Sequence, residues 1–349
     1  MMSTATKTDI RSLDKEEVRA FFADLGEPRY RADQVHQWLW QKSAKDFDAM
    51  TNLSKELREK LTEHFIIKEL SIDQTQTSED GTRKYAFKLS DGNMVEGVLI
   101  PTEKRLTACI STQVGCSLAC EFCATGKLKR MRNLGYSEIY DQVVAIDQEA
   151  RTHYGRGLTN IVYMGMGEPL LNYKNTMESV KHITSESGLN MSPRRLTIST
   201  AGIAKMIEKM ADDEVKVNLA LSLHAANDAK RDSIMAINET NNLDILAKSL
   251  RYYHGRTGKK VTFEYIIFKG FNDSIDDAKE LLAFCKRVPA SKVNIIEYNE
   301  VEGDSFKRAD ADQVDRFAAF LEDRGVIAKV RRSRGRDIDA ACGQLANKN

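Results

Sequence analysis

The sequence has little of several features that mark specialised classes of protein. It holds five prolines among 349 residues, with no internal repeat and no low-complexity tract, which excludes a proline-rich or disordered chain. Its formal net charge is only +1, so the molecule as a whole does not indicate a polyanionic partner. With 42% hydrophobic residues the chain can bury a core. A chain of this length is long for one domain and short for three.

Long apolar runs are also absent. No run approaches the roughly 20 residues that a membrane-spanning helix needs, and the N-terminal stretch MMSTATKTDIRSLDKEE lacks the apolar centre of a secretory signal. We therefore expect a cytoplasmic protein with no membrane partner. Six cysteines are too few for a disulfide scaffold in a chain of this size. Three of them fall within eight residues, however, and that cluster is informative.

The first part of the chain is predicted to be helical. Apolar residues from Val18 to Leu25 keep helical spacing until GEP at 26–28 interrupts them, and further helices are expected around 35–39 and from Ser54 onward. We assign residues 1–66 to a small helical accessory domain. Residues 82–89 and 94–101, joined by the turn sequence SDGN, predict a β-hairpin, and residues 67–101 are assigned to a β extension.

From residue 106 onward, strand and helix patterns alternate. The predicted strands are 106–112, 158–164, 195–200, 216–223, 260–268 and 292–298, with a further candidate at 326–332. The predicted helices are 137–154, 174–187, 202–211, 243–255, 275–287 and 310–324. Six strand–helix units in a row predict a parallel sheet, whose ligands bind at the carboxyl ends of the strands. The alternation alone does not decide between a curled and an open sheet.

The clustered cysteines lie directly after the first of these strands. They form Cys116-x3-Cys120-x2-Cys123 in the segment VGCSLACEFCATG. Three thiolates on one short loop suit a [4Fe–4S] cluster, and three protein ligands leave one iron open to a substrate. Two alternatives remain: inert core cysteines, or a structural zinc site that takes a fourth ligand from Cys109, His153 or Cys285.

The cysteine loop resembles that of the radical S-adenosylmethionine (SAM) superfamily. This resemblance implies that the methionine amino and carboxylate groups of SAM chelate the open iron, and that the reduced cluster cleaves SAM to a 5′-deoxyadenosyl radical. The segment MGMGEPLLN (164–172) is similar to the Gly-Glu-Pro segment of the superfamily, which holds the methionine amino group. The glycines would let the backbone approach a ligand, although a plain turn is the alternative.

Polar residues also end three later strands of the series. Ser199, the segment 222–224 and Asn299 each stand where an apolar strand gives way to a loop. Any one of them alone is typical of a cap or turn, but together they would surround a nucleoside at one end of the sheet. The expected SAM-binding residues are Gly167, Glu168, Ser199, Ser222, Leu223, His224 and Asn299.

Nearly the whole chain is similar to the RNA adenine-C2 methyltransferase family, the RlmN/Cfr group. The similarity covers the helical domain, CSLACEFCATG, MGMGEPL, SPRRLTISTAG, LALSLHA, the strand ending at Asn299, and RGRDIDAACGQL near the C-terminus. Gly-Glu-Pro together with VEGVLIP favours the RlmN branch. The implied fold is a partial (βα)6 barrel of the radical SAM type with an N-terminal helical domain and a β extension. Its core would span 102–335, and a C-terminal segment, 336–349, would carry Cys342.

The same resemblance implies a ping-pong mechanism with two molecules of SAM per turnover. One methylates Cys342; the other yields the radical that takes a hydrogen from the methylated sulfur, and the carbon radical adds to C2 of an adenine. Cys109 then helps to resolve the covalent adduct through a transient disulfide with Cys342, while Glu96 accepts a proton. From its strand pattern alone, Glu96 is equally an edge-strand carboxylate facing water. Radical addition suits C2, because that carbon is not nucleophilic.

Two basic runs flank the proposed centre: KLKRMR (127–132) and RRSRGR (331–336). Such runs are usually solvated faces, but their position favours RNA binding here. The family implies methylation of an adenosine in 23S rRNA near the peptidyl transferase centre and of adenosine 37 in some tRNAs, with an electron donor of flavodoxin type and a monomeric enzyme. The rival interpretations are another radical SAM enzyme, such as a glycyl-radical activase, and a zinc-stabilised RNA-binding module.

Overall fold

A ten-stranded sheet runs through the molecule in the order β14-β13-β12-β11-β10-β9-β6-β5-β4-β3. This computed structural model describes residues 7–288 and 292–347, so the ends of the predicted 1–66 and 336–349 units lie outside the described residues. The strands are β3 (Ser71–Thr77), β4 (Arg83–Lys88), β5 (Met94–Pro101), β6 (Leu106–Cys109), β9 (Asn160–Tyr163), β10 (Leu196–Thr200), β11 (Asn218–Ser222), β12 (Thr262–Ile267), β13 (Lys292–Glu297) and β14 (Ile327–Arg331).

Within the ten-stranded sheet, β6 and the strands β9 to β14 are parallel, as the strand–helix alternation predicts. The predicted hairpin is β4 and β5, and it continues the same sheet, because β5 pairs antiparallel with β6 with Val98 opposite Cys109. Hydrogen bonding is therefore unbroken across the boundary that we predict at residues 101 and 102. Short strands β1 (Thr8–Asp9) and β2 (Phe65–Ile66) form one separate pair, and β7 (Gln113–Val114) and β8 (Arg132–Asn133) form another.

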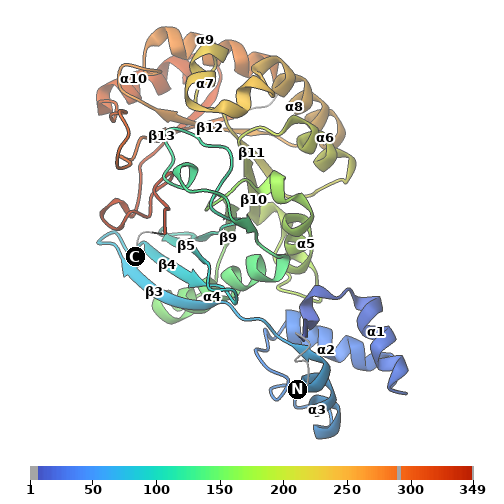
Figure 1. Ribbon diagram of the computed structural model, residues 1–349. Coiled ribbons are helices and arrows are strands. Elements are labelled where there is room, and N and C mark those ends of the chain that lie inside the picture. Colours follow the sequence, from blue (N-terminus) through green and yellow to red (C-terminus); the bar gives the residue numbers. More distant parts are fainter. Residues whose placement is uncertain (1–6, 289–291, 348–349) are drawn as a thin grey trace.

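Helices follow the parallel strands and form an arc along the outside of the sheet (Figure 1). They are α4 (Tyr136–Tyr154), α5 (Tyr173–Thr184), α6 (Ala204–Asp212), α7 (Asp228–Ile234), α8 (Leu243–Thr257), α9 (Ile275–Arg287) and α10 (Ala311–Glu322). Local sequence sets their ends. Ser274 and Asp277 form a capping box at the start of α9, and Gly155 ends α4 in the left-handed conformation that glycine adopts without strain.

The N-terminal region consists of α1 (Lys15–Asp24), α2 (Tyr30–Trp40) and α3 (Lys55–His64), where helices are predicted. It docks on the sheet-bearing part through α2, whose Trp40 ring stacks on His182 of α5 with centroids 3.7 Å apart and contacts Tyr136 of α4 at 5.6 Å. Arg11 adds an ion pair with Asp141 of α4 at 2.6 Å. This region is therefore fixed to α4 and α5, as Figure 1 also shows.

Besides the two-residue strands β1, β2, β7 and β8 and the short 3-10 helices, two longer elements are absent from the sequence-based prediction. Every residue of β3 is exposed, so its sequence lacks the apolar alternation that reveals a strand. Helix α7 has only seven residues, too few for a helical period to stand out. No helix in the described part of the chain is long and apolar enough to cross a membrane.

Candidate active site

A cavity at the carboxyl ends of the parallel strands brings together most of the predicted site residues; we call it the first cavity. Its lining includes Cys116, Cys120, Cys123, Gly167, Glu168, Ser199, Ser222, His224 and Cys342. These residues come from the cysteine loop, from the ends of successive strands and from the far C-terminal segment. Many of these residues follow the ends of parallel strands, where the sequence analysis expects ligands to bind.

The cysteine loop closes tightly on itself. Cys123 N–H donates to the Cys120 carbonyl at 3.1 Å, and a Cβ at Gly126 would lie 2.7 Å from that same oxygen, so only glycine fits there. All three cysteine side chains are partly exposed to the cavity. Burial raises the pKa of the Cys116 thiol to about 11, and it raises the pKa of Cys120 and Cys123 as well.

The donor set fits an iron–sulfur cluster. Soft thiols on one loop are the ligands that hold such clusters. Within residues 7–288 and 292–347, no three His, Cys, Asp or Glu side chains are placed to hold a single metal ion. A cubane spreads its ligands over different iron atoms, so separated thiols suit it better than one zinc ion. Of the candidates for a fourth zinc ligand, His153 pairs with Glu149 along α4 and Cys285 is buried in α9.

Glu168 presents a buried carboxyl group at the end of β9. It is 3% exposed, and its two oxygens accept N–H groups of Leu170 at 2.9 Å and Ala201 at 2.8 Å. Burial raises the pKa of Glu168 to about 7, against the lowering effect of these hydrogen bonds. A carboxylate with spare lone pairs in a dry cavity is a strong partner for an ammonium group.

Gly165 and Gly167 allow the loop after β9 to pack closely within the protein. Gly167 has φ +93°, and a Cβ there would lie 2.4 Å from Cβ of Gln113. A Cβ at Gly165 would lie 2.7 Å from the carbonyl of Ile110. Both glycines thus let this loop pack on the chain's own segment 110–113; both also line the first cavity, and their approach to a ligand stays a prediction. The packing directs Glu168 into the cavity.

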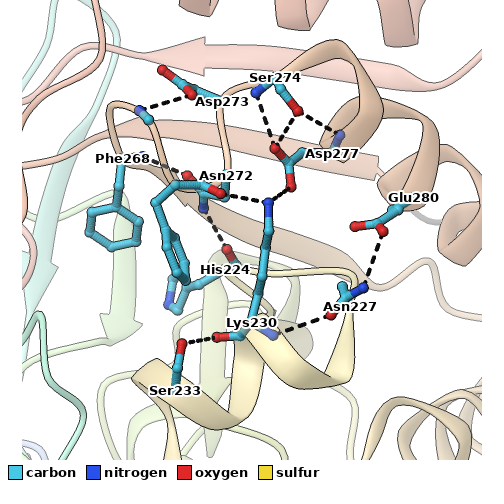
Figure 2. A network of polar contacts seen from close by, with 12 residues as sticks. His224, Asn227, Lys230, Ser233, Phe268, Asn272, Asp273, Ser274, Asp277 and Glu280 are labelled. Atoms are coloured by element: carbon cyan, nitrogen blue, oxygen red, sulfur yellow. Dashed lines mark hydrogen bonds and ion pairs between the residues drawn. The ribbon is translucent and has the colours of Figure 1, made fainter.

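His224 has a backbone conformation that demands support. Its φ is +56°, which is unusual for a residue other than glycine. Fully buried Asn272 donates from its amide to the His224 carbonyl at 2.7 Å, and Figure 2 shows this contact beside the Lys230–Asp277 ion pair. His224 Nδ1 accepts from Ile266 N–H at 3.0 Å, so its proton is on Nε2. Burial lowers the pKa of His224 to about 3, which keeps the ring neutral.

Of the remaining candidates for nucleoside binding, some line the first cavity and others do not. Ser199 and Ser222 meet through their hydroxyls at 3.3 Å. Leu223 and Asn299 are not among the described residues that line the first cavity. The N–H of Leu223 donates to the Glu264 carbonyl and its own carbonyl accepts from Arg231. Asn299 is buried, donates to the Cys342 carbonyl at 3.3 Å, and leaves its Oδ1 without a hydrogen bond.

A second cavity adjoins the first and is lined by the two remaining candidate cysteines. Cys109, from the end of β6, lines it together with Cys342, and Cys123 lines both cavities. Burial raises the pKa of Cys109 to about 12. Cys342 is exposed to the cavities, yet the protein around it removes enough water to raise its pKa too. Cys342 thus shares one cavity with the cysteine loop and another with Cys109.

Glu96 is buried, so the interpretation of it as a water-facing edge carboxylate is wrong. It is 2% exposed, with Oε1 at 3.4 Å from Nζ of buried Lys84. Its Oε2 accepts the N–H groups of Ala346 at 2.8 Å and Asn347 at 3.1 Å. Glu96 is not among the described residues that line either cavity. It anchors residues 335–347, which we call the Cys342 segment.

The basic runs are less free than their sequences indicate. Arg132 pairs with Asp91 at 2.6 Å and Glu138 at 2.8 Å. Arg332 pairs with Glu297, and Arg334 donates to the Pro101 carbonyl at 2.8 Å. Arg331, Arg332 and Arg334 nevertheless line the second cavity. Part of each basic run therefore stabilises the folded protein through these contacts within the chain.

Sequence reasoning missed two residues of the site. Glu264 lines the first cavity from β12, and Arg331 lines the second from the end of β14. Glu264 left a signal, since it is a lone carboxylate inside the apolar stretch VTFEYIIF. Arg331 has no such signal in the sequence, except that the residue belongs to the basic run 331–336.

Comparisons with known proteins agree with this geometry. A family model described as the ribosomal RNA large subunit methyltransferase N-terminal domain matches residues 8–67, and the radical SAM superfamily model matches residues 110–285. The chain is 56% identical to a probable dual-specificity RNA methyltransferase RlmN of Cytophaga hutchinsonii, covering 100% of this chain and 96% of the relative. It is 45% identical to the dual-specificity RNA methyltransferase RlmN of Geobacter sulfurreducens, covering 98% and 93%. The chain belongs to the RlmN family.

A solved structure extends this assignment to the fold. The crystal structure of a radical SAM methyltransferase from Sphaerobacter thermophilus matches with a TM-score of 0.91 and 42% identity, over 97% of this chain and 99% of that chain. The predicted α/β radical SAM fold is confirmed. As an RlmN-family radical SAM enzyme, the protein uses a [4Fe–4S] cluster and SAM.

Proposed function

We propose that this RlmN-family enzyme methylates C2 of an adenosine in 23S rRNA, at the peptidyl transferase centre, and of adenosine 37 in some tRNAs. The names of its relatives as dual-specificity RNA methyltransferases support the two substrates. One observation carries the proposal. Cys342, far along the chain from the cysteine loop, lines one cavity with that loop and another with Cys109.

The residues of the first cavity would bind the two cofactors. Cys116, Cys120 and Cys123 would hold the cluster, and Glu168 would accept the ammonium group of SAM. Gly167, Ser199, Ser222 and His224 would surround the rest of SAM. Leu223 and Asn299 stay predicted SAM-binding residues, although neither is among the described residues that line this cavity. When bound, the cluster and SAM supply the radical that activates the methyl group on sulfur.

The cysteines of the second cavity would carry the methyl group and release the product. Cys342 would lose its thiol proton and gain a methyl group on sulfur; the radical would then take one hydrogen atom from that methyl group, and the carbon would bond to C2 of the adenine. The ring would give up the C2 proton and one electron, which the oxidised cluster would take back. The Cys109 thiolate would afterwards attack the Cys342 sulfur, so that the sulfur–carbon bond breaks, the released carbon takes up a proton as the methyl group of the base, and the two cysteines are joined in a disulfide. Glu96 stays a predicted proton acceptor; to reach the base it would have to release the N–H groups of Ala346 and Asn347.

We further propose the partners that this chemistry needs. RNA would approach the second cavity along the basic residues that line it, with its target base unstacked. A flavodoxin-type donor would supply the electron, and the enzyme would work as a cytoplasmic monomer. The helical region, which matches the N-terminal model of the rRNA methyltransferases, would contribute to RNA binding.

Removal of each cysteine in turn tests the proposal. Cys342→Ala should form no enzyme–RNA adduct and no C2-methyladenosine, because no carbon is carried on sulfur. Cys109→Ala should still attack RNA and then stall, so a denaturation-resistant adduct through Cys342 should accumulate. Mass spectrometry of RNA and protein after anaerobic turnover measures both products.

Cys285→Ala is the matched control, since it removes a buried thiol from α9 and should leave methylation intact. Each of the three variants should bind about four iron atoms per chain, as one cubane requires. Methylation of C2 by Cys342→Ala would overturn the covalent mechanism. Normal turnover by Cys109→Ala, with no trapped adduct, would remove Cys109 from the mechanism.

A further inference from the structure

The end of β14 places one arginine beside both sulfur atoms of the proposed reaction. Arg331 lines the second cavity together with Cys109 and Cys342. Burial is the largest influence on both thiols and raises their pKa, while the charge of Arg331 acts on each in the opposite direction. The shared lining of one cavity thus places the Arg331 side chain near both sulfurs, and the direction of its effect on each pKa agrees with that placement.

A buried carboxylate pairs with this half-exposed arginine, and each of the two residues lines one of the cavities. Glu264 Oε2 lies 3.5 Å from Nη1 of Arg331 and makes no hydrogen bond in the described structure. Glu264 itself is 4% exposed, lines the first cavity, and is held by Asn294, whose amide donates to its Oε1 at 2.8 Å. Pairing with a carboxylate weakens an arginine as an attractor of phosphate but leaves it several N–H donors in a fixed plane.

The geometry of the target base brings its ring nitrogens to the same place. In adenine, C2 is bonded directly to N1 and N3. When C2 bonds to the carbon carried on the Cys342 sulfur, these nitrogens must lie beside that sulfur. A donor that neighbours the sulfur is therefore able to reach a ring nitrogen of the bound base.

We propose that Arg331 is a catalytic residue that donates a guanidinium N–H to N1 or N3 of the target adenine, and that Glu264 is its positioning residue. The inference rests on the proposed function. In the addition step, the carbon on the Cys342 sulfur bonds to C2, one C2–N π bond breaks, and the unpaired electron moves onto the ring; no electron enters or leaves. Electron density grows on the ring nitrogens, where a preorganised cationic donor stabilises it.

Single-turnover adduct formation in the Cys109→Ala background, with the cluster-loaded enzyme and saturating RNA, measures this step. Arg331→Met should slow adduct formation about 10- to 100-fold, the value of a hydrogen bond to a charged group. Glu264→Gln should slow it less, and Arg331→Lys should recover part of the rate. Each variant should be fully methylated on Cys342 before RNA is added, as verified by mass spectrometry of the protein, so that the effect of Arg331 on the Cys342 thiol does not enter the measured rate.

Arg332→Met is the matched comparison, because Arg332 lines the same cavity and loses the same charge but pairs with Glu297 and Asp315. It should weaken RNA binding and lower its salt dependence without slowing adduct formation at saturation. If Arg331→Met behaves in the same way as Arg332→Met, then Arg331 is a phosphate contact and the proposal fails.

RNA with 1-deazaadenosine or 3-deazaadenosine at the target position identifies the nitrogen. If Arg331 acts through one of these nitrogens, replacing that nitrogen by CH and Arg331 by Met in the same reaction should slow adduct formation no more than the larger of the two single changes. Additive losses with both analogues overturn the proposal. Failure of the unchanged enzyme to methylate adenosine would instead contradict the proposed function, so the two failures are distinguishable.

Discussion

Glu168 illustrates how surroundings alter the chemistry of a single residue. Its carboxyl group has a pKa of about 7 in the folded protein, against 4.5 for an exposed glutamate, because it is buried. Between these two pH values the folded protein keeps a proton that the unfolded chain has lost. The free energy of unfolding should therefore fall by about 3 kcal/mol as the pH rises through this window.

Glu168→Gln should remove this pH dependence, since glutamine does not titrate. Urea unfolding of iron-free protein at pH 5 and pH 8 measures it, with Glu63→Gln, on the exposed face of α3, as the control. The same loss of stability between the two pH values in wild type and Glu168→Gln would contradict the assigned pKa. Glu168→Gln should also bind SAM more weakly after reconstitution, with its iron content unchanged.

Single residues were predictable where a motif fixed them. The three cysteines and Glu168 sit on loops whose sequence alone places them after a strand, and all four line one cavity. The surroundings of Glu96 were not predictable, because they depend on backbone N–H groups from residues 346 and 347, far along the chain. Leu223 lies next to two lining residues but is itself fully buried, a distinction that sequence spacing does not make.

At the scale of elements, the loop after β9 depends on glycine for its course. An alanine Cβ at position 167 would lie 2.4 Å from Gln113 Cβ and 2.9 Å from Gln113 N, and φ is +93°. Gly167→Ala should therefore cost at least about 3 kcal/mol of stability through overpacking and backbone strain together. It should also misplace the neighbouring Glu168.

Gly155 provides the matched control for this prediction. It has a positive φ of +66°, at the end of α4, but nothing lies within 4 Å of the position of its Cβ. Gly155→Ala should cost only about 1 kcal/mol, from backbone strain alone. Equal losses in the two variants, measured by urea unfolding, would show that the loop moves away from Gln113 without cost.

Elements were predictable in proportion to their burial. Strands of the parallel sheet such as β12, whose residues are all buried, stand out as apolar runs between helical patterns. The joining of the hairpin to the main sheet was not predictable, because it depends on pairing between β5 and β6 rather than on either sequence alone.

At the scale of the whole molecule, the helical region is attached to the catalytic part by an aromatic stack. Trp40 is 3% exposed and stacks on His182, while its carbonyl accepts the hydroxyl of Tyr140. Trp40→Ala should cost about 3–5 kcal/mol. It should raise the KM for RNA, because the helical region loses its orientation, and leave RNA-independent methylation of Cys342 unchanged.

Trp38→Ala is the control on the same helix, since the Trp38 ring packs against Lys42 within the helical region. It should affect stability less and leave the KM for RNA near that of wild type. Methylation assays over a range of RNA concentrations provide the comparison. An equal rise in KM for both variants would show that the aromatic stack does not set the orientation of the helical region.

The attachment of the Cys342 segment has a consequence for how the enzyme fails when it is warmed. Its buried apolar side chains are small except for Leu345, and it is held largely by hydrogen bonds to Glu96, Asp80 and Thr125. Segments held in this way open locally at a lower free energy than the sheet beneath them. We therefore expect heat inactivation and melting to be two separate events: catalysis should stop first and return on cooling, while the sheet is still folded.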